Sequence, residues 1–236
     1  MTARGFFVTG TGTGVGKTVV TRALTGALID LGRRAVALKP IESGVTGEPE
    51  DATALGRVAS PPLTAREVSL YTFRAPVSPH LAAAREGLRI EKESVLRFLA
   101  KWSEQAEIVI AEGAGGLLVP LSESLTYGDL IAETRFELII VAPNVLGAIN
   151  ATLLTIEAAR TRRIPILGVI LNGTPEADLG NREAIIIHGR VPVLGEFPRV
   201  EPPRSRLLAE TAVKSVDLDA LTGLQCPLGP ANIKKK

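Results

Sequence analysis

The feature that most constrains this chain is a glycine-rich segment, Gly10-Thr-Gly-Thr-Gly-Val-Gly-Lys17-Thr18, which follows an apolar run and opens a segment of helical period. A strand, a glycine-rich turn and a helix in this order are typical of a phosphate-binding loop, whose N–H groups converge on phosphate oxygens at the positive end of a helix. Lys17 adds a positive charge at the β/γ bridge, and the Thr18 hydroxyl is free to bind Mg²⁺. The segment therefore predicts a protein that binds ATP with magnesium.

This loop departs from the simplest phosphate-binding pattern. Five residues rather than four separate Gly10 from Gly16, and Thr11 stands at the usual position of the first glycine. The alternative interpretation is an ordinary glycine-rich turn with a chance Gly-Lys-Thr sequence. The strand expected before the loop and the helix expected after it favour phosphate binding.

Apolar runs bounded by glycine or proline alternate along the chain with segments of helical period. The apolar runs are residues 6–8, 35–38, 108–111, 138–141, 166–171 and 191–194. The helical segments are residues 17–31, 91–105, 126–134, 147–162 and 181–188. The alternation predicts an α/β fold with a doubly wound, mostly parallel sheet, and ligands at the carboxyl ends of its strands. The irregular stretch 41–79 is too long for an ordinary connection, so we expect it to build part of a substrate site.

The composition favours a single cytoplasmic domain. A length of 236 residues fits one large α/β domain, which we place at residues 1–224, with 225–236 as a loosely ordered tail. The 27 Lys and Arg residues nearly balance the 25 Asp and Glu residues, so we expect no binding to nucleic acid or to anionic membranes. The single cysteine, Cys226, favours a reducing compartment, and neither a signal peptide nor a membrane-spanning run is evident.

Charged residues lie where the predicted strands end or a helix begins. Glu112 follows the run 108–111 and is a candidate metal ligand or water-positioning group, with a solvated strand-end glutamate as the alternative. Lys39 ends the second strand and would lie beside the phosphate loop if consecutive strands are neighbours, although a strand-end lysine is more often only a surface charge. Asp51 begins a predicted helix, where an N-cap is its simplest role.

The glycine-rich loop and three further motifs, Lys39-Pro-Ile-Glu-Ser-Gly44, Ser78-Pro-His80 and Glu112-Gly-Ala-Gly-Gly116, resemble in order and spacing those of the dethiobiotin synthetase family. The resemblance runs from about residue 5 to Pro198. It implies a seven-stranded doubly wound sheet with helices on both faces, and a homodimer. It also implies an enzyme that uses ATP, Mg²⁺ and CO₂ or bicarbonate to close a cyclic urea on 7,8-diaminopelargonic acid, through a carbamate and its mixed anhydride with phosphate.

The resemblance also assigns roles to individual residues. Magnesium would be held by Thr18, Asp51 and Glu112. ATP would be bound by Gly12, Gly14, Val15, Gly16, Lys17, Thr18, Val19, Asn172 and Pro198. The catalytic residues, which would bind carbamate and γ-phosphate oxygens, would be Lys17, Lys39, Thr13 and Ser43. The remaining substrate-binding residues would be Gly115, Leu146, Gly147, Ile149 and Asn150, in addition to Thr13, Lys39 and Ser43.

The segment 144–150 leads into a helix, so the N–H groups of that helix's first turn are candidates to bind the substrate carboxylate. By resemblance this segment comes from the neighbouring subunit. A tight turn before an ordinary helix is the alternative. Glu42 has two open roles, offsetting the positive charge of Lys39 or receiving a substrate ammonium group, and a structural imidazole is the simplest role for His80.

A nucleotide-switch ATPase of the partition or division-site type is the rival from another functional class, because it shares the expected fold. Such proteins carry a lysine five residues before the main lysine of the loop, whereas this chain has Gly12 there. An amphipathic membrane-binding helix is also not apparent in residues 222–236, which contain two glycines and two prolines. Gly14 stands where some dethiobiotin synthetases carry an acidic residue.

Overall fold

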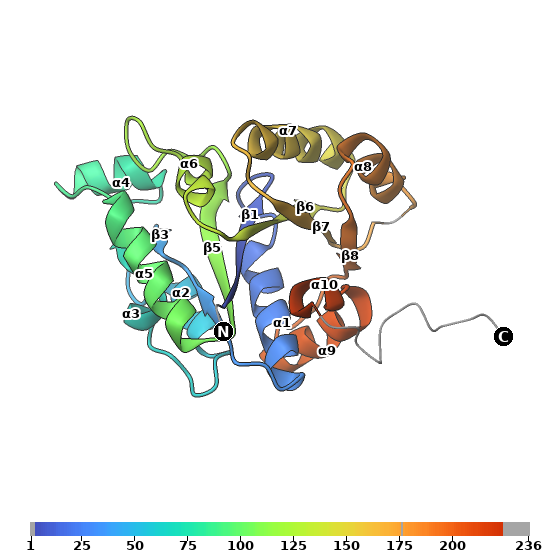
Figure 1. The fold of residues 1–236 in the computed structure, drawn as a ribbon, viewed down its shortest axis with the longest axis horizontal. Helices are drawn as coiled ribbons and strands as arrows, with labels where there is room; N and C mark the ends of the chain where they lie inside the picture. The colour runs from blue at the N-terminus through green and yellow to red at the C-terminus, as the bar shows by residue number, and fades with distance from the viewer. Residues whose placement is uncertain (1–2, 176, 224–236) are drawn as a thin grey trace.

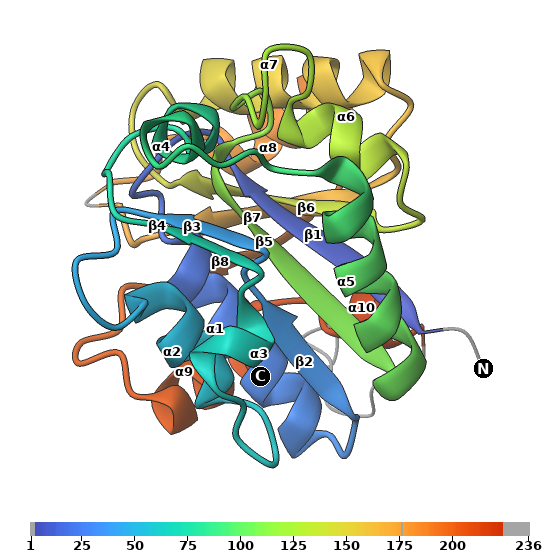
Figure 2. The ribbon, with the colours of Figure 1, turned by 90° about the vertical axis from the view of Figure 1, so that its left-hand side faces the viewer.

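A computed structural model describes residues 3–175 and 177–223, and its centre is a six-stranded parallel sheet (Figures 1 and 2). The strand order is β2-β5-β1-β6-β7-β8. The bounds of these strands are β1 Arg4–Gly10, β2 Ala35–Leu38, β5 Ile108–Gly116, β6 Glu137–Pro143, β7 Ile166–Asn172 and β8 Val193–Phe197. The middle strands are buried on both faces, which explains why they read as continuous apolar runs in the sequence.

Helices cover both faces of this sheet (Figure 2). One layer contains α1 Lys17–Asp30, α9 Ser205–Ser215 and the short α10 Asp219–Thr222. The other contains α5 Lys92–Gln105, α6 Tyr127–Ala132, α7 Ala148–Thr161 and α8 Asn181–Gly189. Alternate residues of β1 face opposite layers: Phe6 and Val8 pack in the cluster of α1, whereas Phe7 packs in the cluster of α5 and α6. The predicted doubly wound α/β fold is confirmed.

The stretch 41–79 forms a small substructure beside the carboxyl end of β2. It contains β3 Ile41–Ser43, α2 Glu50–Gly56, α3 Ala65–Val68 and β4 Tyr71–Phe73, and it leads into α4 Pro79–Arg85. Strands β3 and β4 pair in parallel with each other as a separate two-stranded sheet. Helix α2 packs on α1 and β2 through Ala52 and Leu55, which are fully buried. The start of α2 is thereby held near the start of α1.

Two expectations about the sheet need correction. The resemblance implied seven strands, but in the described residues the main sheet has six, because β3 and β4 pair with each other as a separate two-stranded sheet instead of joining it. Consecutive strands β1 and β2 are also not neighbours: β5 lies between them, pairing with β1 on one side and β2 on the other. The point of reversal in strand order therefore lies beside the phosphate loop.

No helix within residues 3–175 and 177–223 is long and apolar enough to cross a membrane. The predicted boundary between a domain at 1–224 and a tail at 225–236 stays a prediction, because residues 224–236, including Cys226, lie outside the described part of the chain.

Candidate active site

The glycine-rich loop connects β1 to α1 as the sequence predicted, and its shape depends on glycine. Gly14 and Gly16 have φ angles of 75° and 90°, in the left-handed region that favours glycine. A Cβ atom at Gly16 would also collide with the side-chain amide of Asn172, which donates a hydrogen bond to the backbone oxygen of Val15 at 2.9 Å. Asn172, at the end of β7, therefore stabilises the loop. Lys17 lies over the loop, with its Nζ 3.3 Å from the backbone oxygen of Gly12.

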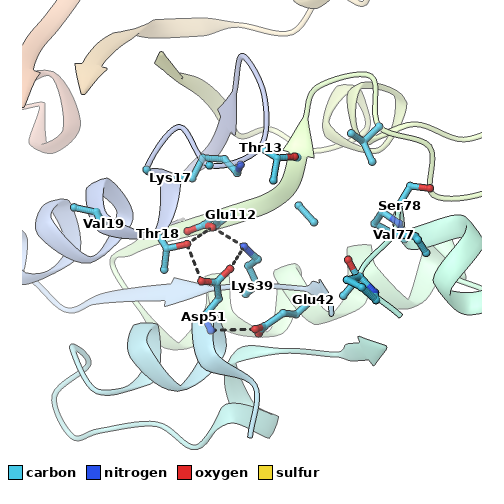
Figure 3. Close-up of a pocket in the computed structure, with 18 residues that line it drawn as sticks. Thr13, Lys17, Thr18, Val19, Lys39, Glu42, Asp51, Val77, Ser78 and Glu112 are labelled. Atoms are coloured by element: carbon cyan, nitrogen blue, oxygen red, sulfur yellow. Dashed lines mark hydrogen bonds and ion pairs between the residues drawn. The ribbon is translucent and has the colours of Figure 1, made fainter. Parts of the chain in front are cut away.

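Three oxygen-bearing side chains and one lysine meet below this loop (Figure 3). Thr18 Oγ1 lies 2.8 Å from Glu112 Oε1 and 3.0 Å from Asp51 Oδ1. Lys39 Nζ lies 2.6 Å from both Glu112 Oε1 and Asp51 Oδ2. Thr18 comes from α1, Glu112 from the middle of β5, Asp51 from the first turn of α2, and Lys39 directly follows β2. Lys39 follows β2, which pairs with β5 rather than with β1. It therefore lies beside Glu112 of β5.

The oxygens of this cluster fit a Mg²⁺ ion. The single proton of the Thr18 hydroxyl can satisfy only one of the two carboxylates at a time, so acceptors outnumber donors. Glu112 is fully buried, and its Oε2 atom has no hydrogen-bond partner within the described residues. Two carboxylates and a hydroxyl are a donor set that Mg²⁺ uses when phosphates and water complete its shell. Thr18, Asp51 and Glu112 are thus the residues that would hold the ion.

The electrostatics of the cluster keep Lys39 and Asp51 charged. Burial lowers the pKa of Lys39, but the charges and hydrogen bonds of Glu112 and Asp51 outweigh burial and raise it above the ordinary value. Burial raises the pKa of Asp51, but Lys39 outweighs that effect, so the pKa of this carboxyl lies below its ordinary value. The pKa of Lys17 is lowered, chiefly by burial. Lys39 is therefore firmly bound to the two carboxylates.

The structure decides roles that the sequence left open for Asp51 and Glu42. The N-cap of α2 is Pro49 and Asp51 is its second residue, so the N-cap interpretation of Asp51 is wrong. The Asp51 carboxylate points instead at Thr18 and Lys39 (Figure 3). Glu42 uses both carboxylate oxygens to accept the backbone N–H groups of Asp51 and Ala52, each at 3.0 Å. The solvated alternative for Glu112 is likewise wrong, because Glu112 is fully buried.

The four predicted catalytic residues line one cavity of about 630 Å³. Of the predicted site residues, the cavity is lined by Thr13, Gly14, Gly16, Lys17, Thr18, Val19, Lys39, Ser43, Asp51, Glu112 and Gly115. The wall opposite the loop is made by residues 76–79, which belong to the stretch 41–79 that we expected to build part of a substrate site (Figure 3). His80, whose Nδ1 lies 3.0 Å from Ser78 Oγ, helps to shape this wall.

The other predicted site residues do not line this cavity, although Gly12, Val15 and Asn172 belong to the loop or touch it. Leu146, Gly147, Ile149 and Asn150 are at the start of α7 and do not line it. Leu146 is 90% exposed, and Gly147, with a φ of 91°, is the N-cap of α7. Pro198 follows β8, next to the end of β7 that carries Asn172. The turn 146–150 therefore presents apolar surface outward rather than to the site of its own chain.

The strand, phosphate loop and facing carboxylates define a P-loop nucleotide-binding protein of the α/β class. A family model described as an AAA domain matches residues 4–204. Sequence comparison is more specific, and the chain belongs to the family of ATP-dependent dethiobiotin synthetases.

Three relatives illustrate this membership. The chain is 44% identical over 177 residues to the ATP-dependent dethiobiotin synthetase of Anaeromyxobacter dehalogenans, an alignment that covers 74% of this chain and 79% of the relative. It is 42% identical over 193 residues to that of Rhodopseudomonas palustris, covering 82% of this chain and 84% of the relative. It is 37% identical over 203 residues to that of Bacillus subtilis, covering 84% and 88% respectively.

Two solved structures share the fold. A ParA family ATPase from Chlorobium tepidum has a TM-score of 0.54 at 14% identity and covers 94% of each chain. The MinC:MinD cell division complex of Aquifex aeolicus has a TM-score of 0.56 at 16% identity and covers 96% of this chain and 98% of the other. At this identity they show the fold alone, so the partition or division-site alternative is less well supported than the synthetase.

Proposed function

We propose that this chain closes the ureido ring of dethiobiotin from 7,8-diaminopelargonic acid and CO₂, using ATP. One amine of the substrate takes up CO₂ to give a carbamate, whose oxygen attacks the γ-phosphorus and releases ADP. The second amine then attacks the carbonyl of the carbamic-phosphoric anhydride and releases phosphate. The observation that carries the proposal is the cavity in which the phosphate loop, Lys17, Lys39 and the two carboxylates meet, in a chain of this family.

The side chains around the cavity fit phosphoryl transfer between two oxygens, which requires positioning and charge neutralisation more than covalent help from the protein. Lys17 and Lys39 would bind oxygens of the γ-phosphate and of the carbamate, and the hydroxyls of Thr13 and Ser43 would orient them. Thr18, Asp51 and Glu112 would hold Mg²⁺. When bound, the ion would neutralise charge that develops on the transferred phosphoryl group.

The nucleotide would follow the loop toward the carboxyl ends of β7 and β8. Gly12, Gly14, Val15, Gly16, Lys17, Thr18 and Val19 would bind its phosphates. Asn172 and Pro198 would contact the base, since the two strands that precede them are neighbours in the sheet. Support for this path comes from Asn172, whose amide already touches the loop at Val15.

The proposed assembly is a homodimer in which the turn 146–150 of one subunit completes the cavity of the other. Support comes from the exposed apolar residues at this end of the molecule: Leu146 is 90% exposed, Leu154 of α7 is 58% exposed and Ile187 of α8 is 65% exposed. Covering such residues with a second copy removes apolar surface from water. The N–H of Ala148 donates to the backbone oxygen of Val145, and the N–H groups that follow it in the first turn of the 14-residue helix α7 would then bind the substrate carboxylate.

The proposed reaction is tested by phosphate release from ATP. Hydrolysis is expected to be weak with ATP and Mg²⁺ alone, because the acceptor of the phosphoryl group is the carbamate. Addition of 7,8-diaminopelargonate with bicarbonate is expected to increase phosphate release strongly. If phosphate release does not depend on the diamine but increases with DNA or lipid vesicles, the nucleotide-switch ATPase would be favoured over the synthetase.

The shared site predicts complementation between two inactive variants. Lys17→Ala inactivates the loop, and Gly147→Asp puts a negative charge where the substrate carboxylate would bind, in a residue type that tolerates positive φ. After subunit exchange, about a quarter of wild-type turnover should return, because half of the randomly paired dimers have one intact site of two. As a control, Lys17→Ala mixed with the double variant Lys17→Ala/Gly147→Asp should stay inactive. No recovery despite proven exchange would mean that each site belongs to one subunit.

A further inference from the structure

Helix α2 has no cap of its own. Its N-cap residue, Pro49, has φ and ψ angles of −63° and 108° and carries no side-chain oxygen. The first N–H groups of a helix have no partner within the helix and normally bond a side chain at the N-cap position. In α2 the groups that such a side chain would bond are the N–H groups of Asp51 and Ala52, the second and third residues of the helix.

Glu42 takes the place of this missing cap. Its Oε1 accepts the N–H of Asp51 and its Oε2 accepts the N–H of Ala52, each at 3.0 Å. Glu42 lies in β3, and its residue is only 6% exposed. Both oxygens of Glu42 therefore accept hydrogen bonds from the helix. The two N–H groups and the positive end of the helix stabilise the negative charge of Glu42.

The bond to Asp51 fixes the backbone of a residue whose side chain lies in the metal cluster. On one side of Asp51 the carboxylate reaches Thr18 and Lys39, and on the other side the N–H is held by Glu42 (Figure 3). The chain that leads into α2 gives little support, because residues 46–48 are exposed. Without Glu42, the first turn of α2 would have two unsatisfied N–H groups and an exposed approach.

We propose that Glu42 is a positioning residue for the metal site: it holds the first turn of α2 so that the Asp51 carboxylate faces Thr18 and Glu112. This inference rests on the proposed role of Asp51 as a ligand of Mg²⁺. It distinguishes Glu42 from the substrate-binding residues, although Glu42 also lines the cavity. Loss of Glu42 should weaken metal binding and leave the affinity for the diamine unchanged.

The test measures Mn²⁺ binding to the full chain with ADP, by electron paramagnetic resonance. Glu42→Ala is expected to weaken Mn²⁺ binding by about tenfold, the effect of losing a helix N-cap. The Mg²⁺ concentration for half-maximal turnover should rise by a similar factor, while kcat at saturating Mg²⁺ and the KM for the diamine stay near their wild-type values. Glu42→Gln, which keeps the size and one acceptor, should give a smaller change in the same direction.

A second substitution separates capping from other effects of removing Glu42. In the Glu42→Ala background, Pro49→Ser supplies a hydroxyl at the N-cap position without adding charge, and should restore most of the lost metal affinity. Pro49→Ala in the same background removes the proline without adding an acceptor, and should restore none. Thermal unfolding of each variant reports whether it is folded, and Glu42→Gln carries the test if Glu42→Ala is not.

Asp51→Asn separates the failure of this inference from failure of the metal assignment. If Asp51→Asn weakens Mn²⁺ binding but the Glu42 variants do not, Asp51 is a ligand and the positioning role of Glu42 is wrong. If Asp51→Asn leaves binding unchanged, the metal assignment fails and the role of Glu42 fails with it. A raised KM for the diamine with unchanged metal binding in Glu42→Gln would show that Glu42 binds a substrate ammonium group instead.

Discussion

Lys17→Ala is expected to lower turnover by about 10²-fold or more, because it removes a positive charge from the phosphoryl group during transfer. The variant should remain folded, since within the described residues the Lys17 side chain donates only to the backbone oxygen of Gly12, at 3.3 Å. Initial rates of diamine-dependent ADP formation at saturating ATP provide the measurement, with thermal unfolding to verify the fold.

The matched control for this change is Lys92→Ala. Lys92 is paired with Glu133 at 2.7 Å on the surface, and it does not line the cavity that Lys17 lines. Surface ion pairs contribute little, so turnover and stability should stay close to wild type. If Lys17→Ala turns over as fast as Lys92→Ala, the segment 10–18 is not the site of phosphoryl transfer.

Lys39→Met is expected to lower turnover by a similar factor, about 10²-fold, because it removes the second cation that faces the transferred group while keeping the length of the side chain. The same substitution should not weaken metal binding. Lys39 occupies Glu112 Oε1 and Asp51 Oδ2, so an ammonium group that competes with a metal ion for the carboxylates is removed. Mn²⁺ binding in the presence of ADP should therefore be at least as tight as in the wild type.

These two readouts separate a catalytic from a purely structural Lys39. Turnover near the wild-type value would mean that the second cation has been misplaced. Lost turnover together with weakened metal binding would mean that Lys39 is needed to hold Asp51 and Glu112 in place, so that the fall in rate follows from a damaged metal site. Lys92→Met is the control for loss of a paired lysine elsewhere.

The elements of the fold follow from local sequence patterns, but their pairing does not. Apolar runs and helical period predicted β1, β6, β7 and α1 to within two residues of their bounds, whereas β5 extends well beyond its predicted run 108–111. The order of strands depends on contacts between distant segments, such as the pairing of Ala35 with Ile108. Hydrophobic periodicity indicates which residues are buried, but it does not indicate which strand pairs with a given strand. The position of β5 between β1 and β2 was therefore not predictable in this way.

The sequence predicted which side chains meet where a residue's position follows from its own motif. Thr18 lies in the loop motif and Glu112 follows the predicted run 108–111, and the structure brings them to 2.8 Å from each other, with Glu112 inside β5 rather than at its end. Asp51 was harder, because its local position favoured an N-cap and only the family resemblance suggested a ligand. The role of Glu42 could not be predicted from local patterns. Its partners are the backbone N–H groups of Asp51 and Ala52, which follow an intervening loop, and no pattern of side chains indicates such a contact. The wall at 76–79 lies in the stretch 41–79 that was expected to build part of a substrate site, although no local pattern showed which of its residues would face the cavity.

The central claim is that the chain transfers the γ-phosphoryl group of ATP to a carbamate and closes a ring. The most direct measurement follows the carbon: the chain is incubated with ATP, Mg²⁺, 7,8-diaminopelargonate and ¹³C-labelled bicarbonate, and products are identified by mass spectrometry alongside the ADP formed. If the proposed reaction is correct, dethiobiotin should carry the label in its ureido carbonyl, and ADP should form in equal amount. ADP formation without labelled dethiobiotin would contradict it.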